Sequence, residues 1–297
     1  MKKIIIITGL TGSGKSGLAI DIAKNYNGEI ISADSVQIYK GLDIGSAKVT
    51  KEEMSEVFHH LIDIKNSDEN YNVGEFVEDC KFAINDIIGK NKLPIIVGGT
   101  GLYIKSLIEG YTLGQSKSDL DFRKKYEEMA EKEGNIAVWN VLNQINPQKA
   151  QTVHYNNIKR VIRYIELTNN PNIPEKKESI LNGFECLKIA IIDDRNIIYN
   201  KINKRVDKMI DLGLESEVVD LVHNGLTENH QSMNSIGYKE WFDYFNGRKS
   251  KEETVELIKQ HTRNYCKRQL TFLKTINGLE FLDLNQAKEK IERFLNG

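Results

Sequence analysis

The sequence predicts an α/β protein in which helices flank a parallel sheet and a helical domain is inserted into the chain. Three observations lead to this fold class. A β-branched run, Lys3–Thr8, passes into a glycine-rich loop and then into an amphipathic helix. Two further short apolar runs follow, with helical segments between them. A polar stretch at about 115–187 has helical patterns and no convincing strand.

Strands and helices alternate along the first part of the chain. Lys3–Thr8 is predicted to be a buried strand because the run is apolar on both faces. The helix Ser16–Lys24 follows, with its apolar residues on one side. Strands are predicted at Glu29–Ala33 and Leu93–Val97, and Ala83–Ile88 ends a helix between them. This order implies parallel strands joined by right-handed crossovers.

The second part of the chain leaves the sheet and then returns to it. The core is predicted to comprise 1–114 and 188–297, and the insertion 115–187. In the insertion, Ile158–Ile165 has the apolar spacing of an amphipathic helix, which Asn169–Pro174 ends. Later elements are a buried strand at Leu187–Ile192 and helices at Asn196–Leu212, Leu214–His223 and Thr254–Thr275.

The composition excludes several classes of protein. No apolar run is long enough to cross a bilayer, so no membrane association is expected. The 3 cysteines lie far apart, which excludes a disulfide framework or a CxxC zinc site and fits a reducing cytoplasm. A net charge of -1 gives no overall attraction to nucleic acid.

One segment is locally basic despite the balanced net charge. Leu257–Leu279 contains no acidic residue. It carries Lys259, Arg263, Lys267, Arg268 and Lys274. Arg263, Lys267 and Lys274 recur at helical spacing and are expected to form one stripe. The segment alone is equally consistent with a solvated helix face and with a contact surface.

The glycine-rich loop matches the phosphate-binding pattern G-x-x-x-x-G-K-[ST] without a mismatch. Its residues are Gly9, Leu10, Thr11, Gly12, Ser13, Gly14, Lys15 and Ser16. The glycines let backbone N–H groups surround an anion, and the following helix adds partial positive charge. Lys15 would contact the terminal phosphate, and Ser16 could ligate Mg²⁺. The core is therefore expected to be P-loop NTPase-like and to hold a diphosphate or a triphosphate.

Polar side chains follow the two other early strands. Ligands of open α/β sheets bind at the carboxyl ends of strands. Asp34, after the second strand, could cap a helix, hold Mg²⁺ or act as a base. Thr100 follows the third strand among Gly98, Gly99 and Gly101, and these glycines are expected to leave room for a ligand such as a flipped base. His59–His60 has no ligand partner at metal spacing, so packing or a hydrogen-bonded turn is expected there.

The loop does not decide the reaction. A small-molecule kinase using ATP would share the loop and the carboxylate. A nucleotide switch would need a guanine-recognition stretch, and the sequence has no Asn-Lys-x-Asp. Of these two, the kinase is the alternative that the loop alone leaves open.

Several segments together resemble one family. Besides the loop, the matching stretches are Glu29–Gly45 with Ala47–Lys48, His59–Ile64, Pro94–Tyr103, Asn203–Met209, Ile236–Lys239 and Thr262–Gln269. In this order they resemble the tRNA dimethylallyltransferases, also called tRNA isopentenyltransferases, in their compact bacterial form. The Asp-Ser-x-Gln of Asp34–Gln37 and the late Lys-Arg-Gln-x-Thr are the specific parts.

The resemblance implies a prenyl transfer. The donor would be dimethylallyl diphosphate, held in the P-loop with Mg²⁺, and the acceptor the N6 amine of the adenosine 3′ to the anticodon of tRNA. That base would be flipped out of its loop. Asp34 would be the general base, Thr100 a contact of the substrate nucleotide, and Lys15 and Arg205 would stabilise the departing diphosphate. A monomer would suffice.

The resemblance also implies a set of tRNA contacts. They are Asp34, Ser35, Val36, Gln37, Thr100, Arg123, Lys159, Arg160, Arg163, Gly237, Tyr238, Lys239, Lys267, Arg268, Gln269 and Lys274. The basic segment near the carboxyl terminus would then be an RNA contact. The chain departs from the family pattern at Arg163–Leu167, at Phe272 in place of Trp, and at Leu10 where Pro is frequent. These departures put only the details of tRNA packing in doubt.

Overall fold

The computed structural model describes residues 2–110, 120–170 and 178–297. The chain divides into two compact units, Met1–Glu109 with Ser179–Gly297, and Gly110–Glu178. Within the described ranges, no helix combines the length and the apolar character needed to cross a membrane. The first unit holds the sheet and is called the core, and the second is called the insertion.

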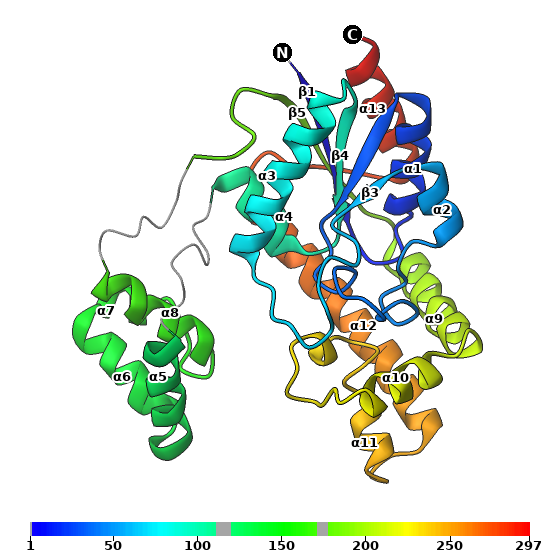
Figure 1. Ribbon diagram of the computed structural model, residues 1–297. Coiled ribbons are helices and arrows are strands. Elements are labelled where there is room, and N and C mark those ends of the chain that lie inside the picture. The colour runs from blue at the N-terminus through cyan, green and yellow to red at the C-terminus, as the bar shows by residue number, and fades with distance from the viewer. Residues whose placement is uncertain (1, 111–119, 171–177) are drawn as a thin grey trace. The chain divides into compact units, whose positions relative to one another are not determined.

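The core is built on a six-stranded sheet whose paired strands all run parallel, which confirms the predicted α/β class. The order across the sheet is β3-β2-β4-β1-β5-β6. The strands are β1 (Lys3–Gly9), β2 (Gly28–Ser32), β3 (His59–His60), β4 (Leu93–Gly98), β5 (Glu185–Ile191) and β6 (Glu280–Leu282). Ile5 of β1 lies in register with Ile95 on one side and Leu187 on the other. The P-loop strand is therefore central and buried (Figure 1).

Helices cover both faces of this sheet. In Figure 1, α1 (Lys15–Asn25) and α13 (Leu284–Asn296) lie on one side, and α3 (Val73–Gly89) and α4 (Gly101–Glu109) on the other. Ile22 and Ile291 belong to the apolar cluster on the first face. On the second face, the rings of Phe76 and Tyr103 stack with centroids 4.1 Å apart. The short helix α2 (Lys51–Glu56) precedes β3 and begins with a capping box at Thr50.

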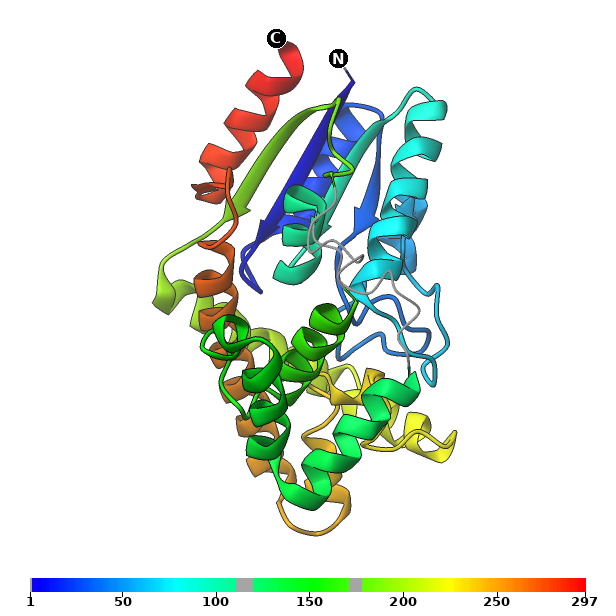
Figure 2. The same cartoon turned by 90° about the vertical axis from the view of Figure 1, so that its left-hand side faces the viewer.

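The helices between β5 and β6 gather at the carboxyl end of the strands, below the sheet in Figure 1 and Figure 2. They are α9 (Arg195–Asp211), α10 (Leu214–His223), the 3₁₀ turn η1 (Ser232–Asn234), α11 (Trp241–Phe245) and α12 (Lys251–Leu273). The long helix α12 packs against α9, α4 and β1. It begins with a capping box in which Ser250 and Glu253 bond each other's backbone N–H. Because α12 reaches β1, it can contact the P-loop.

The insertion has its own apolar core. Its helices are α5 (Leu120–Glu133), α6 (Asn135–Ile145), α7 (Pro147–Ala150) and α8 (Ile158–Asn169). Val138 and Leu142 of α6 pack with Val161, Ile162 and Ile165 of α8. The amphipathic helix predicted from Ile158–Ile165 is thus present. Of the predicted breaker, residues 171–174 lie outside the described part of the chain.

The boundaries of the insertion differ from the sequence-based ones. The compact unit spans residues 110–178, whereas 115 and 187 were expected. The difference at the carboxyl-terminal boundary has a local cause. The strand β5 begins at Glu185, whose side chain is exposed, and the next residue, Cys186, is only half-buried. Leu181 is already buried before the strand begins. The apolar run at Leu187 therefore marks the buried part of β5 and not its start.

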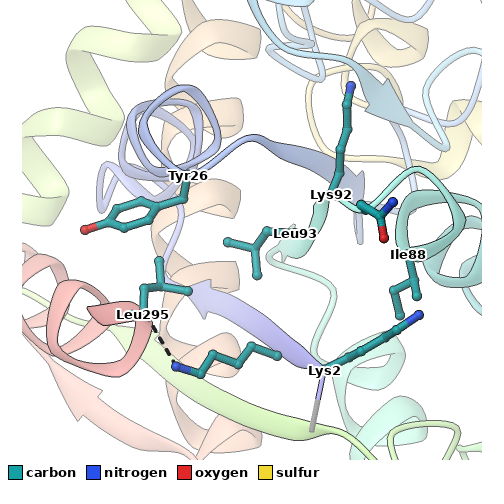
Figure 3. A pocket seen from close by; sticks show the side chains of 8 residues that line it. Lys2, Tyr26, Ile88, Lys92, Leu93 and Leu295 are labelled. Atoms are coloured by element: carbon teal, nitrogen blue, oxygen red, sulfur yellow. Dashed lines mark hydrogen bonds between the residues drawn. The ribbon is translucent and has the colours of Figure 1, made fainter. Parts of the chain in front are cut away.

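A cavity of about 380 Å³ lies at the amino end of the strands, away from the P-loop. Figure 3 shows its lining, with Tyr26 directly after α1, Leu93 of β4 and Leu295 of α13 facing it. The ammonium of Lys3, which also lines it, donates to the carbonyl of Phe294 at 2.7 Å and so closes the end of α13. This cavity contains none of the predicted site residues.

Candidate active site

The P-loop has the backbone shape that its glycines permit. Gly12 and Gly14 have φ of 82° and 85°, in the left-handed region that favours glycine. A Cβ at Gly9 would lie 2.3 Å from the carbonyl oxygen of Ile191, so only glycine allows β1 to approach β5 there. The N-cap residue of α1 is Gly14, and no side chain of the described residues caps this start of the helix. Its first N–H groups therefore remain for an anion.

Part of the loop is held by its own hydrogen bonds. The N–H of Leu10 donates to the carbonyl of Ile191 at 3.2 Å, and the N–H of Ser13 donates to Leu10 at 3.1 Å. The hydroxyl of Ser13 is buried and has no hydrogen-bond partner among the described residues. A buried hydroxyl of this kind calls for a partner from outside the chain. Together with the uncapped α1, it fits a loop built for a ligand with many oxygen atoms.

Lys15 belongs to the loop, and its side chain lies near the turn that follows β4. Its ammonium donates to the carbonyl of Leu10 at 3.3 Å. A Cβ at Gly99 would lie 3.8 Å from it. Burial of the ammonium and the nearby charge of Arg205 lower the pKa of Lys15 from 10.5 to about 8, against an opposing effect of Asp34. An anion in the loop would raise this pKa again and keep the charge in place.

Arg205 belongs to α9, and its charge acts on Lys15. Its guanidinium donates to the carbonyl of Ser46 at 3.2 Å. Burial lowers the pKa of Arg205, and the Coulombic effect of Asp34 opposes the change. Arg205 interacts electrostatically with both Lys15 and Asp34. Residues 15, 34 and 205, remote in sequence, are therefore gathered in one charged site.

Asp34 directly follows β2 and is anchored by its own turn. Its Oδ1 accepts from the N–H of Val36 at 2.9 Å and of Gln37 at 3.3 Å. Thr100 adds a second anchor, because its Oγ1 accepts from the N–H of Ser35 at 3.0 Å. The sequence left Asp34 open as a cap or as a catalytic group. It caps its turn with one carboxylate oxygen, and its role as a base stays a prediction.

The glycines around Thr100 do not leave room for a base, which corrects the sequence-based expectation. A Cβ at Gly98 would lie 2.1 Å from the carbonyl oxygen of Ala33, and one at Gly99 would lie 2.6 Å from Nε2 of Gln269. A Cβ at Gly101 would lie 2.6 Å from the ring of Phe272. The space is filled by the protein. These glycines admit the neighbouring strand and two side chains of α12.

Glu217 was not singled out from the sequence, yet it organises one side of the site. Its carboxylate accepts from the N–H groups of residues 43, 44 and 45 at 3.1, 2.7 and 3.1 Å. The next residue, Ser46, accepts the hydrogen bond from Arg205. The amide of Gln37 also donates to Ser46, at 3.4 Å. No local pattern distinguishes Glu217 from other acidic residues of a helix, so only the fold could reveal it.

The predicted tRNA contacts differ in the exposure of their side chains. Six are exposed basic side chains: Lys159, Arg160, Lys239, Lys267, Arg268 and Lys274. Two are buried: the Tyr238 hydroxyl donates to Glu217 at 2.7 Å, and Gln269 contacts the P-loop. These two side chains face the protein interior and offer no surface to RNA. At Gly237, with φ of 97°, the N–H is likewise taken, by Glu240.

Some predicted basic contacts are engaged in ion pairs or hydrogen bonds. In the insertion, Arg123 and Arg163 contact the same buried carboxylate, Glu166, at 2.9 and 2.8 Å. On α12, Arg263 donates to Asn203 of α9 at 2.6 Å. Arg263 therefore joins two helices, and the exposed part of the expected stripe narrows to Lys267 and Lys274.

His60 forms part of an ion-pair cluster at the edge of the sheet. Its Nε2 lies 2.7 Å from a carboxylate oxygen of Glu29, which Lys92 also contacts at 2.7 Å. Asp86 lies close enough to complete a three-ligand set, but Lys90 contacts it at 2.6 Å. The lysines already neutralise the carboxylates. Packing and hydrogen bonding, expected from the sequence, describe this cluster better than a metal site does.

Comparison with known proteins places the chain among relatives. The family model described as IPP transferase matches residues 37–276. The chain belongs to the IPP transferase family. A protein of Oceanobacillus iheyensis named tRNA dimethylallyltransferase is 42% identical over 100% of this chain and 96% of its own length. A protein of the same name from Bacillus anthracis is 41% identical, again over 100% of this chain.

Solved structures agree with this family. The tRNA isopentenylpyrophosphate transferase of Bacillus halodurans matches with a TM-score of 0.73 and 36% identity, covering 100% of this chain and 96% of that one. A eukaryotic dimethylallyltransferase described as acting on tRNA matches with a TM-score of 0.79 and 28% identity, over 99% and 78% of the two chains. The IPP transferase fold is thus shared along the whole chain, including the P-loop that precedes the family-model match.

Proposed function

We propose that this IPP transferase transfers a dimethylallyl group from dimethylallyl diphosphate to the N6 amine of the adenosine 3′ to the anticodon of a tRNA, releasing diphosphate. The observation that carries the proposal is the cluster of Lys15, Arg205 and Asp34 beside the P-loop. The two cations interact with each other and would stabilise a departing anion, and the carboxylate follows β2, which β4 separates from the P-loop strand β1. The full-length relatives named tRNA dimethylallyltransferase support the same reaction.

The chemistry follows from these groups. The bond between the allylic carbon and the diphosphate oxygen breaks, and its electron pair leaves with the diphosphate. Lys15, Arg205 and the loop N–H groups stabilise that growing charge. The amine nitrogen attacks the allylic carbon, and Asp34 accepts the proton that the nitrogen loses. Because an aryl amine is a weak nucleophile, its placement beside the carbon contributes more than the strength of the base.

The oxygen donors of the loop fit Mg²⁺. Ser16, in the first turn of α1, offers a hydroxyl of the kind that holds this ion with phosphate oxygens. When bound, Mg²⁺ would neutralise part of the charge on the diphosphate. The fit rests on the donor type and on the unpartnered Ser13 hydroxyl, which shows that the loop has unsatisfied polar atoms.

The acceptor would bind along the exposed basic side chains. Lys267 and Arg268 lie on α12, close in sequence to the residue that contacts the P-loop. Lys239 lies in the turn before α11. The cradle, the carboxylate and the arginine all come from one chain, so a monomer would be sufficient for the reaction.

Incubation with dimethylallyl diphosphate labelled in its prenyl carbons tests the proposal. With Mg²⁺ and no added nucleotide, label should pass to unmodified tRNA and to an anticodon stem-loop. Guanosine in place of the target adenosine should abolish transfer, because the attacking amine is gone. Movement of the γ-phosphate of ATP to a small molecule, with tRNA left unlabelled, would make the protein a kinase and refute the proposal.

A further inference from the structure

The side chain of Gln269 is enclosed between the P-loop and the turn after β4. It belongs to α12 and is 5% exposed. Its Oε1 accepts from the N–H of Thr11 at 3.1 Å and from the hydroxyl of Thr11 at 3.2 Å. Its Nε2 donates to the carbonyl of Gly99 at 2.9 Å. One amide therefore connects α12 to both the donor loop and the turn that carries Thr100.

The orientation of this amide is fixed by its partners. The N–H of Thr11 can only donate, and the carbonyl of Gly99 can only accept. If the amide were rotated by half a turn, its NH₂ group would face the N–H of Thr11, and its oxygen would face the carbonyl of Gly99. Neither pair can form a hydrogen bond. A carboxylate in place of Gln269 could satisfy Thr11 but would repel the Gly99 oxygen. A hydrocarbon would leave both backbone groups buried without a partner.

The surroundings of Gln269 give its contacts a role in holding the loop. Leu10 of the loop packs with Cys266, one turn earlier on α12, and with Ile202 of α9. Gly99 has no Cβ, and one would lie 2.6 Å from Nε2 of Gln269. One side of the P-loop is therefore held by α12, and its free backbone N–H groups would bind the diphosphate. The neighbouring Lys267 and Arg268 point away from this contact, because both are exposed.

We propose that Gln269 is a positioning residue of the transfer reaction: its amide holds the P-loop against the Gly99–Thr100 turn, so that the loop N–H groups stay arranged for the diphosphate of the donor. The assignment rests on the proposed function for the identity of the donor. Because Gln269 is only 5% exposed, its side chain offers almost no surface to RNA. Preorganised donors bind an anion without first paying the cost of ordering the loop, so loosening the loop weakens donor binding.

The test separates donor binding from RNA binding. Gln269→Leu and Gln269→Glu are compared with the wild type for the KM of the donor, kcat, tRNA affinity and the affinity for inorganic diphosphate by calorimetry. Both variants should raise the donor KM and the diphosphate dissociation constant about tenfold or more, while tRNA affinity stays within about twofold. The matched variant is Lys267→Ala, an exposed residue two positions before Gln269 on α12. It should weaken tRNA binding and leave diphosphate affinity unchanged.

The Gln269→Glu variant adds a pH readout that a purely structural role would not give. A protonated carboxyl group can donate to Gly99 and still accept from Thr11. Its diphosphate affinity should therefore recover toward the wild-type value at acidic pH, relative to the wild type at the same pH. Unchanged diphosphate affinity in both variants, with weakened tRNA binding or only a smaller folded fraction, would overturn the assignment. Calorimetry with diphosphate needs no prenyl transfer, so this result is separable from failure of the proposed function.

Discussion

The Oγ1 atom of Thr100 accepts a hydrogen bond from the backbone N–H of Ser35 at 3.0 Å. This bond joins the turn after β4 to the turn after β2. It is reinforced by the N–H of Thr100, which donates to the carbonyl of Ala33 at 3.3 Å. Asp34 lies between Ala33 and Ser35, which both bond to Thr100, so the position of Asp34 depends on Thr100. Thr100, predicted as a nucleotide contact, has the structural task of holding the turn that presents Asp34.

Asp34→Asn should lower kcat by about 10² to 10⁴ while donor binding is retained. The asparagine oxygen can still accept from Val36 and Gln37, so the turn should keep its shape. Only the ability to take a proton is lost. Single-turnover transfer to tRNA and calorimetry with diphosphate measure the two effects. Turnover within tenfold of the wild type would remove Asp34 from the role of base.

The pKa of about 8 at Lys15 predicts a pH dependence of donor capture. The ammonium loses its charge as pH rises through this value, so kcat/KM for the donor should fall above about pH 8, approaching tenfold per pH unit. Lys15→Arg keeps its charge across this range, and its profile should stay flat. A wild-type profile that is level from pH 7 to 9.5 would contradict the depressed pKa.

Neutralising the exposed pair Lys267 and Arg268 should weaken tRNA affinity and reduce its salt dependence. Each lost phosphate contact removes about one unit from the slope of log affinity against log salt. Filter binding across a salt series measures this slope. Lys288→Ala, an exposed lysine of α13 on the far face of the sheet, is the control and should leave the slope unchanged. An unaltered slope in the double variant would mean that the pair is only solvated.

Tyr238→Phe should destabilise the protein by about 1 to 2 kcal/mol, because the hydroxyl that donates to Glu217 at 2.7 Å is removed in a buried place. Urea unfolding measures the loss. The affinity for tRNA should stay within about twofold, since the ring is fully buried. A large drop in affinity with unchanged stability would instead place the Tyr238 hydroxyl at the RNA surface.

Features that depend on a short stretch of residues could be predicted from the sequence. The runs that became β1, β2, β4 and β5 are apolar and bounded by turns, and Lys15 follows from a fixed spacing. The edge strands β3 and β6 have 2 and 3 residues, too few to show any period. The glycines at 98, 99 and 101 were misjudged because sequence shows where a side chain is missing, but not what fills the space. Gln269 and Glu217 act through contacts more than 150 residues away in the chain.

The central place of β1 has a consequence for synthesis on the ribosome. One edge of β1 pairs with β4, but the other must wait for β5, which begins at Glu185. At roughly 5 to 20 residues per second, the stretch between β4 and β5 takes roughly 5 to 20 s to be made. During that interval an apolar strand edge is open to wrong partners. The insertion, with its own apolar core, is made in this interval and can fold before the sheet is complete.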